Sequence, residues 1–572
     1  MNTSDALNLA SSHLSSLTLA AIPMAEKVKT MYPEIALFAA TCIVMIVGLS
    51  KSYPLRKLCG PICFIALAIS GVLAHFTFAP TGTTPLENLP HYGKIIVAIV
   101  GMLLTLLIAG SADREYEIAI SRGEPYNPLK ATRAEFYSFF LFSLTGLMLC
   151  AGADDLIWLF LALELTSLPT YIMVSMSTRH NRSMEAGVKY FFLGALGAAT
   201  FLYGFTMLYG GTGSTSLSEI QRILAEQSAA GGISGIAMTG LVLSVLGIAF
   251  KIAAVPMHFY TPDVYQGASS PIAAMLAFVP KTAGFFALLL LISCVGWNAA
   301  DGKLPEPLHQ ILWIMAALTM TVGNVLALLQ TSVKRTLAYS SVAHSGYMLV
   351  GLLAGPGAPG APFTRNGLAA VLFYLLAYGV MNLGAFAVLA CLERTGKDGK
   401  PDECDSFSDL RGLCRSSPIL GYTMVLSALG LLGLPPTLGF FGKLPLFTAA
   451  ISAGEIPLVV ILGLNSAIAA FYYLRLAGTP WLETLEIAPG TSPPRLAPFF
   501  SRTVAGFCSA AGVVILAVVP VTSYALRAAE YRDRSTNPAK PLVAPRAGVK
   551  VAPAPTLAPA MPADHTPQAS KL

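Results

Sequence analysis

The chain has 572 residues, of which 55% are hydrophobic and only 12% are charged, with a mean hydropathy of +0.65 and a formal net charge of +6 at pH 7. Soluble domains carry about twice that charged fraction, and apolar runs long enough to cross a bilayer recur from end to end, which excludes a soluble globular domain. The nine cysteines include no CxxC pair and give no indication of an iron–sulfur cluster, a zinc site or a disulfide framework.

Apolar runs define the predicted membrane segments. We expect about fourteen spans, each near the ~20 residues that a helix needs to cross the hydrocarbon core. In chain order they fall within residues 31–49, 58–79, 92–110, 135–151, 154–176, 187–210, 234–257, 270–296, 309–330, 334–354, 366–392, 417–452, 456–478 and 502–526. The twelfth range is too long for one straight crossing and contains GLPPTLGFFGK, so we predict a broken or re-entrant helix there. The predicted fold class is an all-α polytopic membrane protein.

The loops between these spans predict how the chain is oriented. Lysine and arginine are concentrated in the loops after spans 1, 3, 5, 9, 11 and 13. The loop after span 7 has neither, and the loops after the even-numbered spans up to 12 offer little beyond Arg222, Lys303 and Arg365. Because cytoplasmic loops carry the excess of positive charge, we expect the first set in the cytoplasm and both termini on the opposite face. A multi-pass chain of this size suits a bacterial cell (inner) membrane.

Composition divides the chain into three parts. Residues 1–30 form an N-terminal extension, and residues 31–527 form a transmembrane domain. From about residue 528 the sequence is rich in proline and alanine and has no periodic apolar face. We therefore predict that the tail, 528–572, is disordered.

Six ionisable residues stand out among those within the predicted spans. A charge at the centre of a membrane helix costs roughly 2.5–3.5 kcal/mol on insertion scales, so it is retained only when it is paired, hydrated or used. These candidate site residues are Glu164, Lys189, Lys251, Lys281, His344 and Lys443.

Some of these candidates also have a purely structural interpretation. Lys189 lies near a helix end, from which its amine can snorkel to the cytoplasmic interface. Glu164 can be an ion-pair partner alone, and His344 can be a neutral, hydrogen-bonded core histidine. His258 and Asp263 are weaker candidates, because we expect them past the end of span 7, in the cytoplasmic loop.

Lys251, Lys281 and Lys443 are harder to explain by structure alone, since each has apolar sequence on both sides and a proline nearby. Proline interrupts a helix, so we expect the helices that hold these three lysines to be broken. Broken helices in corresponding places of two halves of a chain indicate a transport site. Spans 7 and 12 fit this pattern. They predict two five-span repeats, about 135–296 and 309–478, which an odd number of spans forces into opposite membrane orientations.

The residue types favour proton transfer. A lysine that alternates between low-dielectric surroundings and a nearby carboxylate takes up a proton in one state and releases it in the other. A row of lysines with a carboxylate at one end can therefore relay protons across the bundle. Sodium would need carboxylate and carbonyl ligands, and acidic residues within the spans are few.

Several motifs resemble the antiporter-like subunits of respiratory complex I. They are GIAFKIAAVPMHFYTPDVYQGASSPIAAML, EAGVKYFFLGALGAATFLYGF, VKRTLAYSSVAHSGYMLVG, LPPTLGFFGKLPLF and NSAIAAFYYLRL, and the resemblance covers roughly residues 30–480. TPDVYQGAS and the lysine of GFFGK are similar to the subunit N family in particular, since subunit M has a glutamate at the latter place.

The resemblance implies a proton-translocating membrane subunit of NADH:quinone oxidoreductase, which couples quinone reduction to a proton gradient. By similarity, the relay consists of Glu164, Lys189, Lys251, Lys281, His344 and Lys443. Glu164 would pair with Lys251 on the broken seventh helix, with Lys281 as the central lysine and Lys443 as the terminal one. Lys189 matches the family's sixth-helix lysine near this pair.

The resemblance also implies cofactors and partners. No cofactor or metal is expected on this chain, because the complex uses NADH, FMN, iron–sulfur clusters and quinone in other subunits. The expected partners are the other membrane subunits, of the J, K, M, L, A and H types, the peripheral redox arm and the lipid bilayer, with no nucleic acid.

Two other functions stay open at this point. A subunit of an Mrp-type Na⁺/H⁺ antiporter shares the broken helices and tends to share the lysine of GFFGK, although TPDVYQG argues against it. A structural membrane subunit would use the same charges only to hold a complex together.

Overall fold

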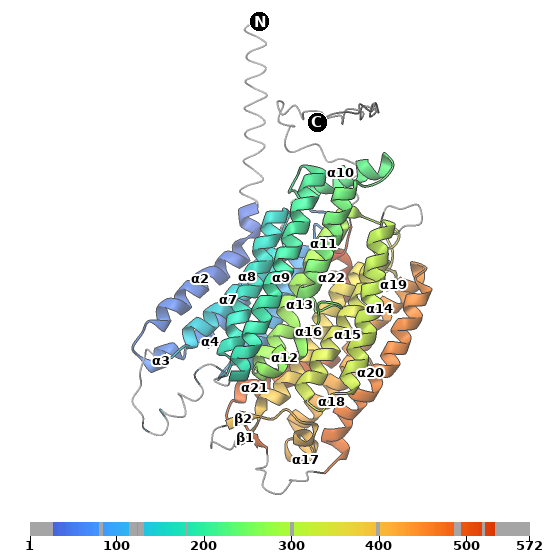
Figure 1. Cartoon of the computed structure of the whole chain (residues 1–572). Coiled ribbons are helices and arrows are strands. Elements are labelled where there is room, and N and C mark those ends of the chain that lie inside the picture. Colours follow the sequence, from blue (N-terminus) through green and yellow to red (C-terminus); the bar gives the residue numbers. More distant parts are fainter. Residues whose placement is uncertain are drawn as a thin grey trace, which may run out of the picture. The chain divides into compact units, whose positions relative to one another are not determined.

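The computed structural model describes residues 27–78, 84–111, 131–178, 181–297, 303–395, 401–484, 494–516 and 521–531, together with positions 113, 120 and 123. All of these residues belong to one compact unit of the chain (Figure 1). Most of the predicted N-terminal extension and most of the predicted tail lie outside the described residues, so the boundaries and the disorder of these parts stay predictions.

Helices dominate the described part of the chain, as the sequence predicts, and strands occur only in connections. The helices are α2 (Tyr32–Gly48), α3 (Tyr53–Arg56), α4 (Cys59–Phe76), α5 (Leu89–Ile108), α7 (Arg133–Ala151), α8 (Leu156–Met176), α9 (Asn181–Thr212), α10 (Leu217–Ala229), α11 (Gly235–Lys251), α12 (Thr261–Gly267), α13 (Ser270–Val295), α14 (Glu306–Leu328), α15 (Val333–Ala354), α16 (Gly367–Cys391), α17 (Leu413–Ser416), α18 (Pro418–Leu432), α19 (Leu438–Ser452), α20 (Ile456–Leu482), α21 (Phe500–Ile515) and α22 (Val521–Ala528). Two 3-10 turns, η2 (Phe363–Arg365) and η3 (Phe407–Leu410), precede α16 and α17. The strands β1 (Leu392–Thr395), β2 (Pro401–Glu403) and β3 (Arg495–Leu496) form an antiparallel sheet in the order β2-β1-β3.

Helix lengths agree with the fourteen predicted crossings. In the described chain, ten helices are long and apolar enough to cross a membrane, and five shorter apolar helices are α2, α11, α18, α19 and α21. Each predicted range overlaps at least one of these helices. Helices α18 and α19 share the twelfth range, which confirms that this segment is broken.

Three helices form the centre of the bundle. Every residue of α13 and α16 is buried, and α15 is buried along nearly its whole length. A helix that is apolar on all sides is stable only when other helices surround it. Outer helices instead expose large apolar side chains, such as Ile46 on α2, Phe192 on α9 and Phe471 on α20. Such surfaces face lipid or another membrane subunit.

Two spans are interrupted inside the bundle. Helices α11 and α12 are the halves of one span, separated by residues 252–260, and α18 and α19 are separated by residues 433–437. Each break contains one cis peptide bond before proline, Val255–Pro256 in the first and Pro435–Pro436 in the second. The prolines explain why neither span continues as one helix, because proline cannot donate the backbone hydrogen bond. The expectation of a break beside Lys281 is wrong, because α13 continues through Pro280 from Ser270 to Val295.

Side chains of α14, of α15 and of the break itself satisfy the backbone that the first break frees. The amide of Val255 donates to Thr319 Oγ1 of α14 at 2.9 Å. Ser345 Oγ of α15 donates to the carbonyl of Ile252, and Tyr260 OH donates to the carbonyl of Phe250 at 2.8 Å. Irregular backbone at membrane depth needs such partners, since no bulk water is available to it.

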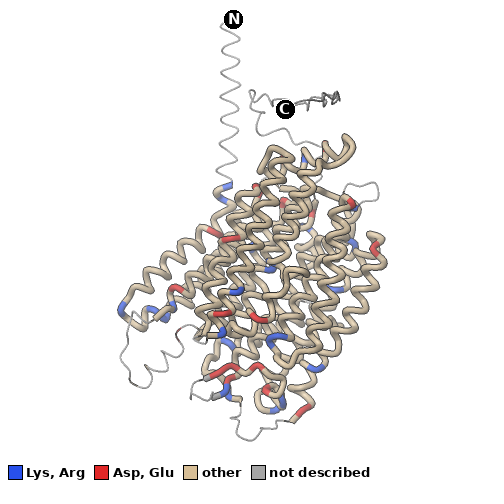
Figure 2. Tube along the Cα trace, in the orientation of Figure 1, with Lys and Arg blue, Asp and Glu red and all other residues tan. Residues whose placement is uncertain are grey.

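The two ends of the bundle carry different elements. Helix α10 lies at one end, and α3, α17 and the β1–β2 pair lie at the opposite end (Figure 1). Lysines and arginines lie at this second end together with acidic residues (Figure 2), and it is the face that the loop charges predict to be cytoplasmic. The membrane orientation itself stays a prediction.

Candidate functional site

A lysine and a carboxylate meet where α11 ends. Lys251 is the last residue of α11, and its Nζ lies 3.0 Å from Glu164 Oε1 on α8 and 2.6 Å from Ser167 Oγ. The centre of the Phe201 ring on α9 lies 5.7 Å from the same nitrogen. The side chain of Lys251 is 2% exposed and that of Glu164 is 18% exposed. Both charged groups are therefore largely shielded from water, and each depends on the other as its counter-charge.

A second lysine lies in the middle of the buried helix α13. Lys281 Nζ donates to Ser341 Oγ on α15 at 2.6 Å and also to the carbonyl oxygen of Ser341. The centre of the Tyr378 ring lies 4.5 Å from this nitrogen, and Tyr265 OH lies 3.3 Å from Ser341 Oγ. The described partners of Lys281 are thus dipoles and an aromatic face. Holding a charge here without a counter-charge is costly, which suits a group that passes a proton on.

The break after α11 brings the two lysines near each other. Gly284 lies one turn beyond the lysine of α13, and a Cβ there would stand 3.0 Å from Lys251 Cβ and 2.6 Å from Ile252 Cγ2. Only glycine allows this approach. On α15, Ser345 Oγ donates to the carbonyl of Ile252 and lies 3.3 Å from the carbonyl of Ser341. The Ser345 hydroxyl of α15 therefore links the backbone beside Lys251 to the carbonyl that Lys281 contacts.

His344 forms the next polar cluster along α15. Its imidazole is fully buried, with Nδ1 at 2.7 Å from Tyr374 OH and Nε2 at 2.7 Å from Tyr473 OH. Tyr473 OH is in turn hydrogen-bonded to Ser340 Oγ. A neutral imidazole has one donor and one acceptor nitrogen, so a ring held between two hydroxyls can accept a proton on one side and release one on the other.

Lys443 lies one turn into α19, after the second break. Its Nζ donates to the carbonyl oxygens of Leu431 and Leu432, at 2.9 Å each. These carbonyls belong to the last turn of α18, where the helix dipole favours a cation. The centre of the Tyr347 ring lies 5.0 Å from the same nitrogen. Lys443 therefore connects the two halves of the broken span.

Tyrosine rings join the lysines to the histidine. The Tyr378 ring, which faces Lys281, has its centre 5.0 Å from that of the His344 ring. The Tyr347 ring, which faces Lys443, has its centre 5.4 Å from the same imidazole. Buried polar and aromatic groups therefore follow one another from α8 through α11, α13 and α15 to α19, with ring contacts in place of described hydrogen bonds between His344 and the two lysines.

Lys189 lies apart from this line. It is on α9 with a side chain 45% exposed, and its Nζ lies 2.7 Å from Glu185 Oε1 and 3.4 Å from Asp263 Oδ2. None of its described contacts joins it to the pair on α8 and α11. The position suits a lysine that reaches the interface, and a place for Lys189 in the relay stays a prediction.

The expectation that Asp263 lies in a loop beyond the helix end is wrong. Helix α12 begins at Thr261 with proline near its start, so Asp263 lies in the first helical turn, where a carboxylate is favoured. Its Oδ1 accepts from Arg335 Nη1 of α15 at 2.8 Å. His258 lies within the break and is buried, and its Nδ1 has no hydrogen-bond partner among the described residues.

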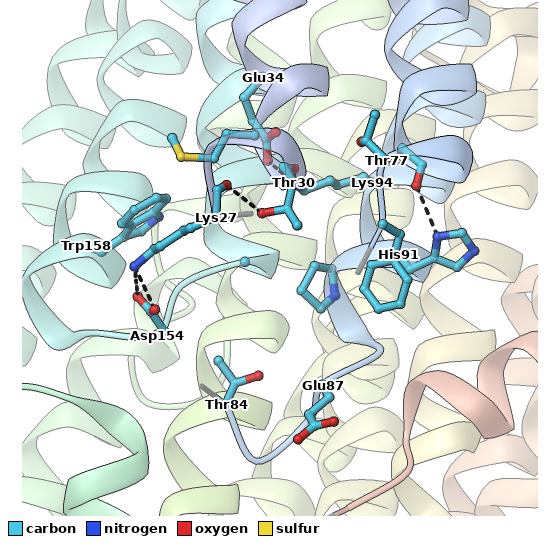
Figure 3. A pocket seen from close by; sticks show the side chains of 15 residues that line it. Lys27, Thr30, Glu34, Thr77, Thr84, Glu87, His91, Lys94, Asp154 and Trp158 are labelled. Carbon is cyan, nitrogen blue, oxygen red and sulfur yellow. Dashed lines mark hydrogen bonds and ion pairs between the residues drawn. The ribbon is translucent and has the colours of Figure 1, made fainter. Parts of the chain in front are cut away.

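Sequence analysis did not single out a second buried ion pair, which joins α2 to α5. Lys94 Nζ lies 2.7 Å from Glu34 Oε1 and donates to the carbonyl of Thr30 at 2.5 Å. Both side chains line a small cavity, beside which Lys27 and Asp154 form another ion pair at 2.7 Å (Figure 3). Glu34 and Lys94 lie near the ends of their spans, where charges normally reach the interface. Their local sequence therefore gives no signal of burial.

Comparisons with known sequences agree on one family. Residues 153–469 match the family described as NADH:quinone oxidoreductase/Mrp antiporter, TM. A protein of Trichlorobacter lovleyi named NADH-quinone oxidoreductase subunit N is 42% identical over 380 residues, which are 66% of this chain and 72% of that protein. A protein of the same name from Salinibacter ruber is 37% identical over 457 residues, covering 79% of this chain and 84% of that protein.

Solved structures agree on the antiporter-like fold. A chain of respiratory complex I from Thermus thermophilus with bound aureothin is 30% identical, with a TM-score of 0.67 over 87% of this chain and 99% of that chain. A chain of the Mrp complex from a Dietzia species has a TM-score of 0.68 over 88% of this chain and 97% of that chain, at 18% identity. The second likeness concerns the fold alone, so the relatives above 30% identity decide between the two families.

Proposed function

The chain belongs to the NADH-quinone oxidoreductase subunit N family, and on that premise we propose that its buried line of ionisable groups carries protons across the membrane. As a member of that family it is a proton-translocating membrane subunit of NADH-quinone oxidoreductase, complex I. The proposed proton carriers are Glu164, Lys189, Lys251, Lys281, His344 and Lys443.

The burial of four ionisable nitrogen groups in one connected line carries this proposal. Lys251, Lys281, His344 and Lys443 are each at most 6% exposed. A charged group at membrane depth is costly and marks an ion pathway or a proton relay when it is retained. Amines and imidazoles bind protons but are poor sodium ligands, because sodium prefers oxygen. The line therefore favours proton transport over sodium transport.

The contacts suggest how a proton moves along the line. While Lys251 holds a proton, Glu164 stabilises the ammonium at 3.0 Å. When that proton leaves toward Lys281 by way of the hydroxyls of α15, the carboxylate loses its counter-charge and attracts the next proton. His344 then passes the proton between its two tyrosine hydroxyls toward Lys443. Each step moves a proton between neighbouring clusters and needs no redox group on this chain.

We infer further that this chain is the translocase part of the enzyme and not its redox part. NADH, FMN, iron–sulfur clusters and quinone would be held by other subunits. Its partners would be membrane subunits of the J, K, M, L, A and H types and the peripheral arm, in a bacterial inner membrane. The bacterial subunit N relatives and the likeness to a chain of Thermus thermophilus complex I support this assignment.

Replacing Lys251 with alanine in the assembled complex tests the proposal. Coupled proton uptake by proteoliposomes is expected to fall strongly, because the amine that binds the proton is gone. Lys57→Ala removes an exposed lysine from the loop before α4 and is the matched control, with pumping near the wild-type level. Normal assembly together with normal pumping in Lys251→Ala would leave these charges with a structural role only.

A further inference from the structure

A carboxylate from the loop after α16 joins the ends of two central helices. Glu403, the last residue of β2, accepts hydrogen bonds from the amide of Ser270 at 2.9 Å and from Ser270 Oγ at 2.8 Å. Ser270 is the first residue of α13. Lys334 Nζ, from the first turn of α15, lies 2.5 Å from Glu403 Oε2 and donates to the carbonyl of Ala268 at 3.0 Å. One carboxylate therefore satisfies a free amide of α13 and pairs with a buried lysine of α15.

Asp405, two residues further on, binds the same region. Its Oδ1 accepts from the amide of Lys334 at 2.8 Å, and its Oδ2 accepts from Ser332 Oγ at 2.6 Å and Gln266 Nε2 at 3.3 Å. Ser332 is the N-cap of α15, and Gln266 belongs to α12. Residues 403–405, which we call the acidic segment, therefore connect α12, α13 and α15 at one end of the bundle.

The Glu403 side chain of the acidic segment is charged at the place where the ends of α13 and α15 meet. Burial alone would raise the pKa of the Glu403 carboxyl, but the Lys334 ammonium and the Ser270 hydroxyl outweigh burial and hold this pKa below its usual value. The carboxylate is therefore ionised at neutral pH. Lys334 is only 4% exposed, so loss of the carboxylate would leave a buried ammonium without a counter-charge.

The bound helix ends lie on the faces that meet at the central lysine. Ser270 and Lys281 are eleven residues apart on α13, and Lys334 and Ser341 are seven residues apart on α15. These separations are about three and two helical turns, so each pair lies on one face of its helix. Lys281 Nζ bonds to Ser341 Oγ at 2.6 Å. A shift of either helix end is passed over about 10–16 Å of rigid helix and changes that contact.

We propose that Glu403 is a positioning residue for proton transfer at Lys281, because it holds α13 and α15 in the register in which the ammonium meets Ser341. The inference rests on the proposed function of the buried lysines and adds a residue outside their line. The loop between α16 and α17 thereby has a function. The loop ties α13, in the first predicted repeat, to α15, in the second.

The test is Glu403→Gln in the complete complex, purified and reconstituted in proteoliposomes. Glutamine keeps the size and an acceptor for Ser270 but removes the charge that holds Lys334. We expect coupled turnover per assembled complex to fall by at least about threefold, well within the ~100-fold that a 1 Å misplacement can cause. The solvent deuterium isotope effect should rise, because a misplaced proton transfer becomes rate-limiting. Asp402→Asn, a similar loss of charge at an exposed neighbour in the same strand, is the control and should change neither quantity.

Two further variants make every result informative. Lys281→Ala tests the proposed function, which fails if this variant pumps protons normally. If Lys281→Ala loses proton pumping but Glu403→Gln keeps the wild-type turnover and isotope effect, only the positioning role is overturned. The double variant Glu403→Gln/Lys334→Gln leaves no unpaired buried charge, so it replaces the single variant if the latter does not assemble. A positioning role predicts low turnover and a raised isotope effect in the double variant also. Wild-type turnover and isotope effect in the double variant would overturn the positioning role. Lower assembly with unchanged turnover per assembled complex would overturn it as well.

Discussion

Replacing Glu164 with glutamine is the sharpest test of the ion pair at the first break. The amide keeps the size of the side chain but removes its charge. The hydrogen bond of Lys251 Nζ at 3.0 Å then loses its anionic acceptor, because the amide oxygen of glutamine is neutral, and the hydrogen bond to Ser167 Oγ at 2.6 Å is unchanged. Such a bond contributes about 1.5–3 kcal/mol. Removing one partner of a fully buried ion pair destabilises a protein by a larger amount, about 3–5 kcal/mol. That range does not apply here, because the Glu164 side chain is 18% exposed.

This loss falls mainly on the protonated form of Lys251, because only the ammonium is attracted by the charge of the carboxylate. At about 1.36 kcal/mol for each factor of ten, the equilibrium between the charged and neutral amine changes by roughly 10- to 150-fold. The complex should still assemble, because the shape of the side chain and the bond to Ser167 remain. Proton loading at the break should become limiting, so we expect coupled NADH oxidation and proton uptake to fall together.

Reconstituted proteoliposomes give both readings, with proton uptake followed by a pH-sensitive dye and NADH oxidation by absorbance. Glu226→Gln is the matched control, because it makes the same chemical change on a side chain of α10 that is 63% exposed. An assembled Glu164→Gln complex whose quinone reduction and proton uptake both equal those of the wild type would refute the ion-pair model.

Two further predictions concern packing and the second ion pair. A Cβ on Gly247 of α11 would stand 2.4 Å from a backbone nitrogen of α9, so Gly247→Ala should destabilise the helix pair by about 1–3 kcal/mol and lower the thermal midpoint of the complex. Gly210→Ala, whose new Cβ would meet its nearest neighbour at 3.9 Å, should leave that midpoint unchanged, and equal shifts for the two variants would refute the argument. Lys94→Met should destabilise the complex by about 3–5 kcal/mol, because it leaves the Glu34 carboxylate buried and unpaired, whereas adding Glu34→Gln should restore part of the loss. A double variant no more stable than Lys94→Met, measured by thermal unfolding, would contradict a direct pairing.

The spans and their breaks could be predicted because hydropathy and proline act over short stretches of chain. Each of the fourteen ranges overlaps a helix, and spans 7 and 12 are broken as predicted, whereas α8 and α13 continue through Pro169 and Pro280. Boundaries were less accurate, since α9 extends over 32 residues, beyond the predicted 187–210 at both ends. Asp263 was placed in a loop because seven residues are too few to show a helical pattern, and α12 depends on packing against α9 and α15.

The candidate lysines could be recognised because each interrupts an apolar run, which is a local property. Glu403 gave no such signal, because a carboxylate in a polar loop is common. Its role becomes visible only when the structure places α13 and α15 beside it. For Lys189 the sequence left two interpretations open, a relay lysine or one that reaches the interface from a helix end. Its side chain is 45% exposed and pairs with Glu185, which agrees with the second interpretation.

The amino-acid sequence by itself determined the membrane class, the helix breaks and the ionisable groups that enter the bundle, because these follow from the free energy of moving short segments into lipid. Only the tertiary structure decided what each group binds. Glu164 and Lys251 are 87 positions apart, and Lys334 and Glu403 are 69 apart. Contacts over such separations depend on how whole helices pack, and a pattern read along one chain segment carries no information about the helix that lies opposite.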